Sequence, residues 1–517
     1  MTFEIVFVLL SLLGMVAALI ADKMRPGMIL FSVVVLFLCA GILTPKEMLE
    51  GFSNKGMITV ALLFLVSEGI RQSGTLGQVI KKLLPQGKTT VFKAQLRILP
   101  SVAFISAFLN NTPVVVIFAP IIKHWAKSVN LPATKFLIPL SYVTILGGIC
   151  TLIGTSTNLV VHGMILEAGF EGFSMFELGK VGIFIAIAGI IYIFLFSKRL
   201  FPDARPDTAV PDEEVEEGEK LHRVEAVLGA RFPGINKKLK DFNFQRHYGA
   251  EVKEIKTRNG QRFVSNLEEV VLHEGDTLVV MADDTFIPTW GESSVFVLLT
   301  NGNEPDTSGK KKRWFALLLL VLMIVGATVG ELPITKEMFP DIKLDMFFFV
   351  SITTIIMAWT NLFPARKYTK YISWDILITI ACAFAISKAM VNSGVADSVA
   401  KFIIGLSDDY GPHVLLAMVF IITNLFTELI TNNAAAALAF PLALSISAQL
   451  GVSPTPFFVV ICMAASASFS TPIGYQTNLI VQGIGNYKFT DFVRIGLPLN
   501  IITFLISIIL IPLIWNF

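Results

Sequence analysis

The sequence is poor in charge. Only 15% of its 517 residues are Asp, Glu, Lys or Arg, compared with about 25% in ordinary soluble domains. Apolar residues reach 54%, above the roughly 45–50% of such domains, so the composition argues against a soluble protein. The formal net charge is +2, too balanced for nucleic-acid binding through a basic surface. We also find no nucleophile–base pair or phosphate loop, so we expect neither an enzyme nor a nucleic-acid partner.

Cysteine is equally scarce. The four cysteines stand singly in apolar segments, at Cys39, Cys150, Cys382 and Cys462. None has the paired spacing of a zinc site or a redox motif, so we interpret them as buried thiols and expect no organic cofactor.

Acidic residues are few except in one segment. Of the 39 Asp and Glu residues, 21 lie between positions 202 and 313, and the other 405 residues share 18. This asymmetry predicts two membrane regions separated by a soluble insert. The expected divisions are a first membrane repeat (1–201), an acidic linker (202–220), a cytoplasmic domain (221–305) and a second membrane repeat (312–517).

Long apolar runs predict the membrane helices, because a crossing needs about 20 mainly apolar residues. Ten crossings are expected, at 3–20, 27–43, 56–74, 136–166, 179–197, 314–330, 346–363, 373–391, 453–484 and 495–515. Two further runs, 92–125 and 411–448, carry polar residues halfway along. Because a straight helix would leave those amides in lipid, we predict re-entrant hairpins there.

The cations indicate an orientation, because short cytoplasmic loops are enriched in Lys and Arg. Placing both termini outside puts the cation-rich loops and the insert 202–313 in the cytoplasm. We therefore expect a multi-pass protein of the plasma (inner) membrane.

The two halves of the chain match each other in sequence. "SAFLNNTPVVVIFAP" (106–120) aligns with "TELITNNAAAALAFP" (427–441), and "TLIGTSTNLVV" (151–161) with "TPIGYQTNLIV" (471–481). Because five crossings per half is an odd number, the second copy must enter the membrane inverted. The expected fold is an all-α polytopic membrane protein, with two inverted repeats of five helices and one hairpin each, plus a small β-rich insert. Secondary transporters use such repeats to build a midplane site.

Each half offers one polar hairpin tip and one glycine-interrupted helix. The tips are 110–112 and 431–433, and the interruptions are 154–158 and 474–478. Gly154 and Gly474 allow the backbone to unwind, which frees carbonyls for a hard cation, while the following helix N-termini favour an anion. Neutral donors hold a doubly charged anion weakly unless cations bind nearby, which predicts bound Na⁺. The expected side-chain ligands of Na⁺ are Ser106, Asn111, Thr427 and Asn432.

Glu428 is an ionisable group at apparent membrane depth, where such groups are commonly functional. Two interpretations stand: proton coupling, or a structural pairing such as one with Lys388. Its counterpart in the first half is Ala107, so it lies outside the repeated set. Glu68 lies near Arg71 in sequence, where a structural pairing is again an interpretation.

At these motifs the sequence resembles the divalent anion/sodium symporter family of the ion transporter superfamily. By that resemblance, one sodium site would comprise Ser106, Asn110, Asn111 and Gly154, and the other Thr427, Ile430, Asn432 and Gly474. The anion would contact Asn110, Asn111, Thr112, Thr155, Ser156, Thr431, Asn432, Asn433, Tyr475 and Gln476. The resemblance also implies a homodimer and an elevator-type motion.

Three of the six tip positions differ from the Ser-Asn-Thr pattern of the family, and Tyr475-Gln476 stands where dicarboxylate carriers tend to have Thr-Pro. We therefore favour sulfate as the small divalent anion. The alternatives are a sodium- or proton-coupled dicarboxylate or citrate carrier, a gated ion channel, and a membrane sensor that does not transport.

The insert begins with an acidic run at 211–220 that is typical of a solvated linker. The segments "AEVKEIK", "EEVVLHEGD" and "TLVVMA" then predict short strands. This stretch is similar to the RCK C-terminal (TrkA-C) domain, which implies a small-molecule ligand. A dimerisation role without a ligand is the alternative.

Overall fold

A computed structural model gives the architecture of most of the chain. It describes residues 3–21, 24–85, 87–202, 222–229, 232–257, 261–283, 286, 290, 295–300, 310–339, 341–406 and 411–517. The acidic run at 211–220 lies outside these residues.

The first half is helical throughout. Its α-helices are α1 (Phe3–Ala21), α2 (Pro26–Cys39), α3 (Pro45–Glu50), α4 (Lys55–Gln72), α5 (Thr75–Leu83), α6 (Val91–Ser106), α7 (Asn111–Ser128), α8 (Thr134–Gly148), α9 (Ser156–Glu167) and α10 (Gly179–Leu200). A 3-10 turn, η1 (Gly51–Ser53), joins α3 to α4. Polar residues begin several of these helices; the Asn54 side chain, for example, accepts the backbone N–H of Gly56 (2.8 Å) at the start of α4.

The second half repeats this succession. Its α-helices are α13 (Lys310–Gly330), α14 (Pro333–Met338), α15 (Met346–Trp359), α16 (Tyr368–Tyr371), α17 (Trp374–Asn392), α18 (Val395–Leu406), α19 (Gly411–Leu429), α20 (Asn432–Leu450), α21 (Thr455–Ser466), α22 (Gln476–Gly485) and α23 (Phe489–Ile514). The 3-10 turn η4 (Ala365–Lys367) precedes α16.

The structure supports a polytopic membrane protein. Among the described residues, eight helical segments are long and apolar enough to cross a membrane. They include six of the ten expected crossings and both arms of the second hairpin, α19 and α20. Of the other four, α2 and α15 are shorter, at 14 residues each. The remaining two, expected at 136–166 and 453–484, are the interrupted pairs α8–α9 and α21–α22.

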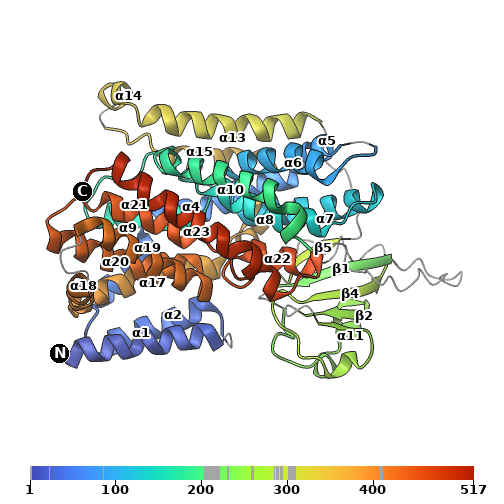
Figure 1. The fold of residues 1–517 in the computed structure, drawn as a ribbon, viewed down its shortest axis with the longest axis horizontal. Helices are drawn as coiled ribbons and strands as arrows, with labels where there is room; N and C mark the ends of the chain where they lie inside the picture. Colours follow the sequence, from blue (N-terminus) through green and yellow to red (C-terminus); the bar gives the residue numbers. More distant parts are fainter. Residues whose placement is uncertain are drawn as a thin grey trace, which may run out of the picture.

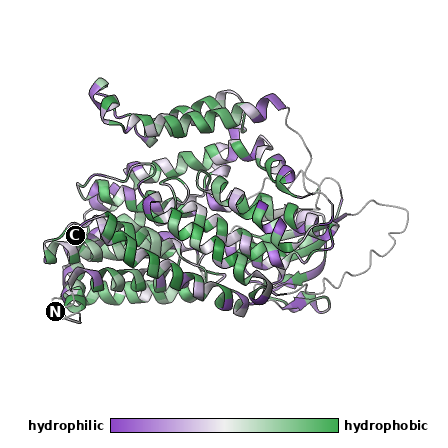
Figure 2. Cartoon of the chain, turned by 45° about the horizontal axis from the view of Figure 1, so that its top comes forward, coloured by the Kyte–Doolittle hydropathy of each residue, from purple (hydrophilic) through white to green (hydrophobic). Residues whose placement is uncertain are grey.

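Elements from the two halves are interleaved. Helix α17 packs on α2 and α20, α4 on α15 and α9, and α10 on α23. Both termini lie at one end of the molecule and the sheet domain at the other (Figure 1). Figure 2 shows hydrophobic residues along the long helices and hydrophilic residues concentrated toward their ends. Cys382 and Cys462 are buried as expected, whereas Cys150 is partly buried and Cys39 is exposed.

The insert folds as a five-stranded antiparallel sheet in the order β3-β2-β4-β1-β5. The strands are β1 (His222–Leu228), β2 (Glu251–Lys256), β3 (Arg262–Phe263), β4 (Thr277–Ala282) and β5 (Phe296–Thr300). A short helix α11 (Phe244–Tyr248) and the 3-10 turns η2 (Leu239–Asp241) and η3 (Leu267–Glu269) complete it.

The β-rich insert is therefore confirmed, with one correction. "TLVVMA" is β4 and "AEVKEIK" contains β2, but "EEVVLHEGD" is not a strand. That segment starts in η3 and makes only an isolated bridge between Val271 and Lys238. Asn266 has a positive φ of 54° just before η3, so the chain turns where alternation predicted extension.

The hairpin arm α6 packs very closely on α8. A β-carbon on Gly147 would overlap the backbone carbonyl of Ala103, so only glycine permits this approach. The contact matters for the site, because α6 leads to one polar tip and α8 leads to one interrupted segment.

Gly147→Ala should destabilise the protein, because the added methyl must push two helix backbones apart. We expect a cost of roughly 1–3 kcal/mol, as overpacking typically has. Gly14→Ala is the matched control, because a β-carbon on Gly14 of α1 meets nothing within 4 Å. Thermal unfolding of the purified variants in detergent measures the difference. Equal melting temperatures for the two variants would contradict this packing.

Candidate functional site

The two hairpin tips are short turns that end at helix N-termini. In the first half α6 stops at Ser106 and α7 starts at Asn111, with Asn110 as its N-cap. In the second half α19 stops at Leu429 and α20 starts at Asn432. Asparagine at these positions competes for backbone hydrogen bonds, and so favours a turn over a continuous helix. Both predicted hairpins are thus pairs of helices joined by a turn, and their re-entrant course in the membrane stays a prediction.

The two interrupted helices repeat one set of hydrogen bonds. The hydroxyl of Thr151 accepts the backbone N–H of Gly154 at 3.2 Å, and that of Thr471 accepts the N–H of Gly474 at the same distance. The amide of Asn158 donates to the carbonyl of Thr151 (2.9 Å). In the second half, Asn478 donates likewise to Thr471 (3.1 Å). Side chains thus satisfy the backbone groups that the helix break exposes.

Within each half the interruption is fastened to the hairpin by the same threonine. Thr151 donates its hydroxyl to the carbonyl of Ala107, and Thr471 donates to that of Glu428 at 3.0 Å. These bonds hold each tip against its own interrupted segment. The signal for both threonines is present in the matched sequences "TLIG" and "TPIG", although the sequence pattern alone gave them no role.

Each interrupted helix also bonds to the hairpin tip of the other half. Thr112 donates to the side chain of Gln476 at 3.3 Å. In the reverse direction, Ser156 (3.3 Å) and Thr157 (3.4 Å) donate to Asn433. The four helices that begin here are α7, α9, α20 and α22, so their N-termini meet at one place.

Tyr475 lies at the centre of these contacts. Its hydroxyl is 2.5 Å from the amide of Asn111 and 3.1 Å from the hydroxyl of Thr155. One phenol of the second half therefore contacts both the tip and the interruption of the first half. The repeat aligns Tyr475 with Thr155, so the second half carries an aromatic side chain where the first half has a small one.

Oxygen atoms converge on the amide of Asn111. The arrangement that satisfies every group directs its oxygen to the Tyr475 hydroxyl. Its nitrogen then donates to the hydroxyl of Ser106 (2.8 Å) and to the carbonyls of Thr144 (3.1 Å) and Gly154 (3.3 Å). These three neutral oxygens could also bind a hard monovalent cation in place of the amide nitrogen. The amide of Asn111 would then rotate so that its own oxygen faces the cation. Thr144 is a member of this set that the sequence analysis missed.

The second half has a comparable set. Thr427 contacts the amide oxygen of Asn432 at 2.8 Å, as Ser106 contacts Asn111, and it donates to the carbonyl of Ala465 at 2.6 Å. A β-carbon on Gly474 would lie 2.6 Å from the carbonyl of Thr427 and overlap Ser468. Glycine is therefore required for this close approach.

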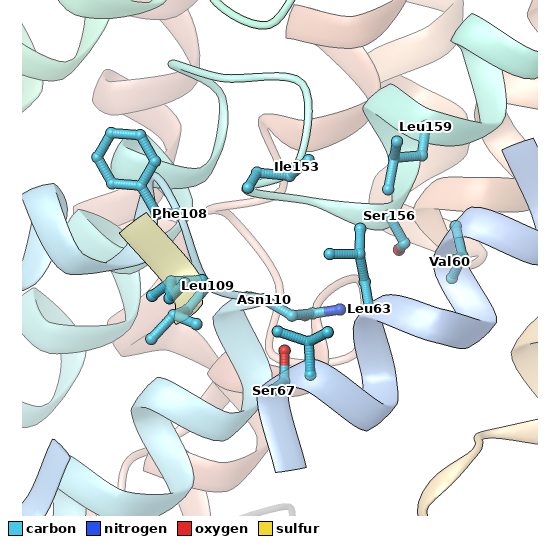
Figure 3. Close-up of a pocket in the computed structure, with 11 residues that line it drawn as sticks. Val60, Leu63, Ser67, Phe108, Leu109, Asn110, Ile153, Ser156 and Leu159 are labelled. Atoms are coloured by element: carbon cyan, nitrogen blue, oxygen red, sulfur yellow. The ribbon is translucent and has the colours of Figure 1, made fainter. Parts of the chain in front are cut away.

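A pocket lies beside the polar cluster (Figure 3). Asn110, Ser156 and Ser67 line it from the first tip, α9 and α4 respectively. The other lining residues are apolar and belong to α4, α9, α13, the first tip and the first interruption: Val60, Leu63, Val66, Phe108, Leu109, Ile153, Leu159 and Leu320. Ser67 was not expected at the site.

The predicted residues thus divide into two groups. Most lie in the hydrogen-bonded cluster: Ser106, Asn111, Thr112, Gly154, Thr155, Ser156, Thr427, Asn432, Asn433, Gly474, Tyr475 and Gln476. Asn110 faces the pocket instead. Ile430 is buried in the apolar core, and the hydroxyl of Thr431 is buried with no hydrogen-bond partner among the residues that the structure describes.

Glu428 makes structural contacts different from the pairing with Lys388 that was considered. Its carboxylate accepts the amide of Asn500 (2.7 Å) and the backbone N–H of Ser470 (2.9 Å). Both partners belong to the second half, so Glu428 links α19 to α23 and to the second interruption. The pairing of Glu68 with Arg71 is present at 2.6 Å.

Comparisons with known proteins agree with this architecture. Residues 16–449 and 342–516 match the citrate transporter family CitMHS. The chain is 30% identical to an uncharacterized transporter of Synechocystis, over 94% of this chain and 93% of that protein. It is 28% identical to a putative sulfur deprivation response regulator of Chlamydomonas reinhardtii (93% and 96%). It is 23% identical to a probable sodium/sulfate cotransporter 3 of the same alga (93% and 85%). The family consists of transporters rather than enzymes, and the Synechocystis protein and the sodium/sulfate cotransporter are named as transporters too. The chain belongs to the citrate transporter family.

Proposed function

We propose that this transporter couples the movement of Na⁺ to that of a small divalent anion, with sulfate as the favoured substrate. The observation that carries the proposal is the meeting of four helix N-termini around uncharged donors. Each N-terminus directs free N–H groups and the positive end of a helix dipole toward the same place. Such a site attracts an anion without a single fixed positive charge.

Sodium coupling follows from what this donor set lacks. Hydroxyls and amides compensate poorly for the desolvation of a double negative charge, so cations bound close by are needed. The oxygens around Asn111 and around Asn432 supply one such place in each half. The probable sodium/sulfate cotransporter among the relatives supports the same assignment for this chain.

The preference for a compact anion rests on Tyr475. Its hydroxyl contacts Asn111 of the first tip, and the matching residue of the first half is the smaller Thr155. A tetrahedral anion can accept from hydroxyls and amides on all sides, whereas an extended dicarboxylate needs a longer space. Citrate is the second candidate, because the chain belongs to the citrate transporter family.

The transport mechanism in this proposal is alternating access of an elevator type. Two inverted repeats would let the cluster face either side of the membrane in turn. The homodimer, the plasma membrane location with both termini outside, and the ligand-binding RCK-like role of the cytoplasmic insert come from the family resemblances and the charge pattern. They form part of the same proposal.

The first prediction from this proposal concerns Asn111 and Asn432, the central asparagines of the two tips. Asn111→Ala and Asn432→Ala should each lower sodium-driven sulfate uptake about 10- to 100-fold, because each removes a hydrogen bond to a charged ligand. The Hill coefficient for Na⁺ should also fall. Asn392→Ala is the control, because Asn392 bonds instead to the carbonyl of Ile42 (3.1 Å) and to Glu47 (3.0 Å).

Uptake of labelled sulfate and labelled citrate into proteoliposomes, with and without an inward Na⁺ gradient, measures this effect. Folded Asn111→Ala and Asn432→Ala proteins with the uptake of the control would contradict the site. Currents that flow without a gradient-coupled flux would indicate a channel instead.

The second prediction separates the size of Tyr475 from its hydroxyl. Tyr475→Thr copies the residue of the first half and should raise the ratio of succinate to sulfate uptake, because it removes the ring. Tyr475→Phe keeps the ring and should still exclude succinate, while sulfate uptake falls about tenfold through loss of one donor to a charged ligand. An unchanged uptake ratio in Tyr475→Thr would show that Tyr475 does not limit substrate size.

A further inference from the structure

The sheet domain contacts two particular helices of the membrane region. Strand β1 packs against α22 and strand β5 against α7. Helices α7 and α22 also pack on each other, and they are two of the four helices that begin at the polar cluster. In Figure 1 the sheet lies beside α7 and α22. The domain therefore contacts α7 near its C-terminal end, at Lys123, and α22 from its first turn, at Leu479, onward.

An ion cluster lies at the centre of this interface. The ammonium of Lys123 in α7 is 2.9 Å from both carboxylate oxygens of Glu225 in β1. Lys256 of β2 reaches the same carboxylate at 3.5 Å. The three side chains are only 21%, 16% and 3% exposed, respectively. Removing one partner of such a cluster leaves a poorly hydrated charge, which is costly.

Burial raises the pKa of Glu225, but the two neighbouring ammonium groups and the hydrogen bond from Lys123 lower it by more, to about 2. Because this pKa is lowered, the carboxylate contributes its full stabilisation of the interface at any pH above its ordinary pKa of 4.5. That stabilisation is lost as the pH falls from 4.5 toward 2. The carboxylate of Glu225 therefore stays ionised throughout the physiological range. The ion pair therefore holds the interface together at physiological pH and does not act as a pH switch.

Close apolar and backbone contacts surround the ion cluster. Val227 of β1 is buried among residues of the membrane core. Gly275 lies against Leu479 of α22, with a positive φ of 84° that lets the loop before β4 turn there. A β-carbon on Gly483 of α22 would lie 3.9 Å from the β-carbon of Thr277 in β4. Thr277 is fully buried. The sheet thus meets α22 along more than one turn.

We infer that the sheet domain is clamped to α7 and α22 through Lys123, Glu225 and Lys256, and moves as one body with the anion site. The inference rests on the proposed function. A rigid helix transmits a displacement along its length, so a change at the clamp changes where the N-termini of α7 and α22 stand. Glu225 is accordingly a positioning residue for the anion site, although it lies outside that site.

The first experiment tests whether the sheet domain moves together with the anion site. The starting variant has its four native cysteines replaced by alanine. Thr277→Cys and Gly483→Cys are then added together, because the β-carbons of these positions lie within the roughly 3.5–4.5 Å separation that a disulfide needs. The oxidised protein should transport within about twofold of its reduced form. Transport that stops on oxidation and returns with reductant would overturn the inference, because the domain would then have to separate from α22 in each cycle.

The second experiment tests the clamp itself. Glu225→Gln removes the negative charge that both lysines bind, so it should slow formation of the disulfide introduced between positions 277 and 483. It should also raise the KM for the transported anion about threefold or more, as mutations within a coupling network typically do, with a smaller change in kcat. Lys253→Gln is the matched control, because Lys253 pairs with Glu251 at 2.7 Å on the same sheet but both are about half exposed.

Each outcome is decisive. Unchanged cross-linking in Glu225→Gln would overturn the ion cluster as the clamp. Slower cross-linking with an unchanged KM would overturn its influence on the anion site. The cross-linking rate needs no substrate, so it tests the interface even if sulfate and citrate both prove to be wrong substrates, and the two proposals fail separately. Val227→Asp provides a second undocking variant that places a charge in the apolar part of the interface, and it should reproduce both effects.

Discussion

The contact between the Tyr475 hydroxyl and the amide of Asn111 is the interaction on which the centre of this protein depends. It joins the second interruption to the first hairpin tip, and the same hydroxyl also contacts Thr155 of the first interruption. A hydroxyl can donate one hydrogen bond and accept two, so a single group can serve both neutral partners inside an apolar protein. Without it, the buried amide of Asn111 would lack a partner from the other half.

This geometry requires helices that stop in the middle of the protein. A continuous helix satisfies its own N–H groups, and it offers none to a ligand. Here Thr151 and Thr471 support the unwound backbone, while Gly154 and Gly474 let it pass close to neighbouring chain segments. The cost of breaking a helix at that depth is offset locally by side chains, and the free N-termini of the next helices become available for an anion.

The sequence predicted the larger part of this arrangement and missed a definite remainder. Hydropathy located the spans, and the internal match located both tips and both interruptions, because those features depend on local composition and repetition. The bridge made by Tyr475, and the roles of Thr144 and Ser67, depend on which elements lie side by side. Helix packing determines that, and single-residue patterns do not record it. "EEVVLHEGD" failed for a similar reason, since a turn at Asn266 outweighed its alternation.

The sheet domain breaks the likeness between the halves. The repeats supply equivalent tips and interruptions, yet the described part of the domain packs chiefly on α7 and α22 among the four helices that begin at the cluster. These two helices come from different halves. A fastening on one helix of each half acts on both sides of the cluster together. Because Glu225 stays ionised across physiological pH, that constraint does not vary with pH in this range.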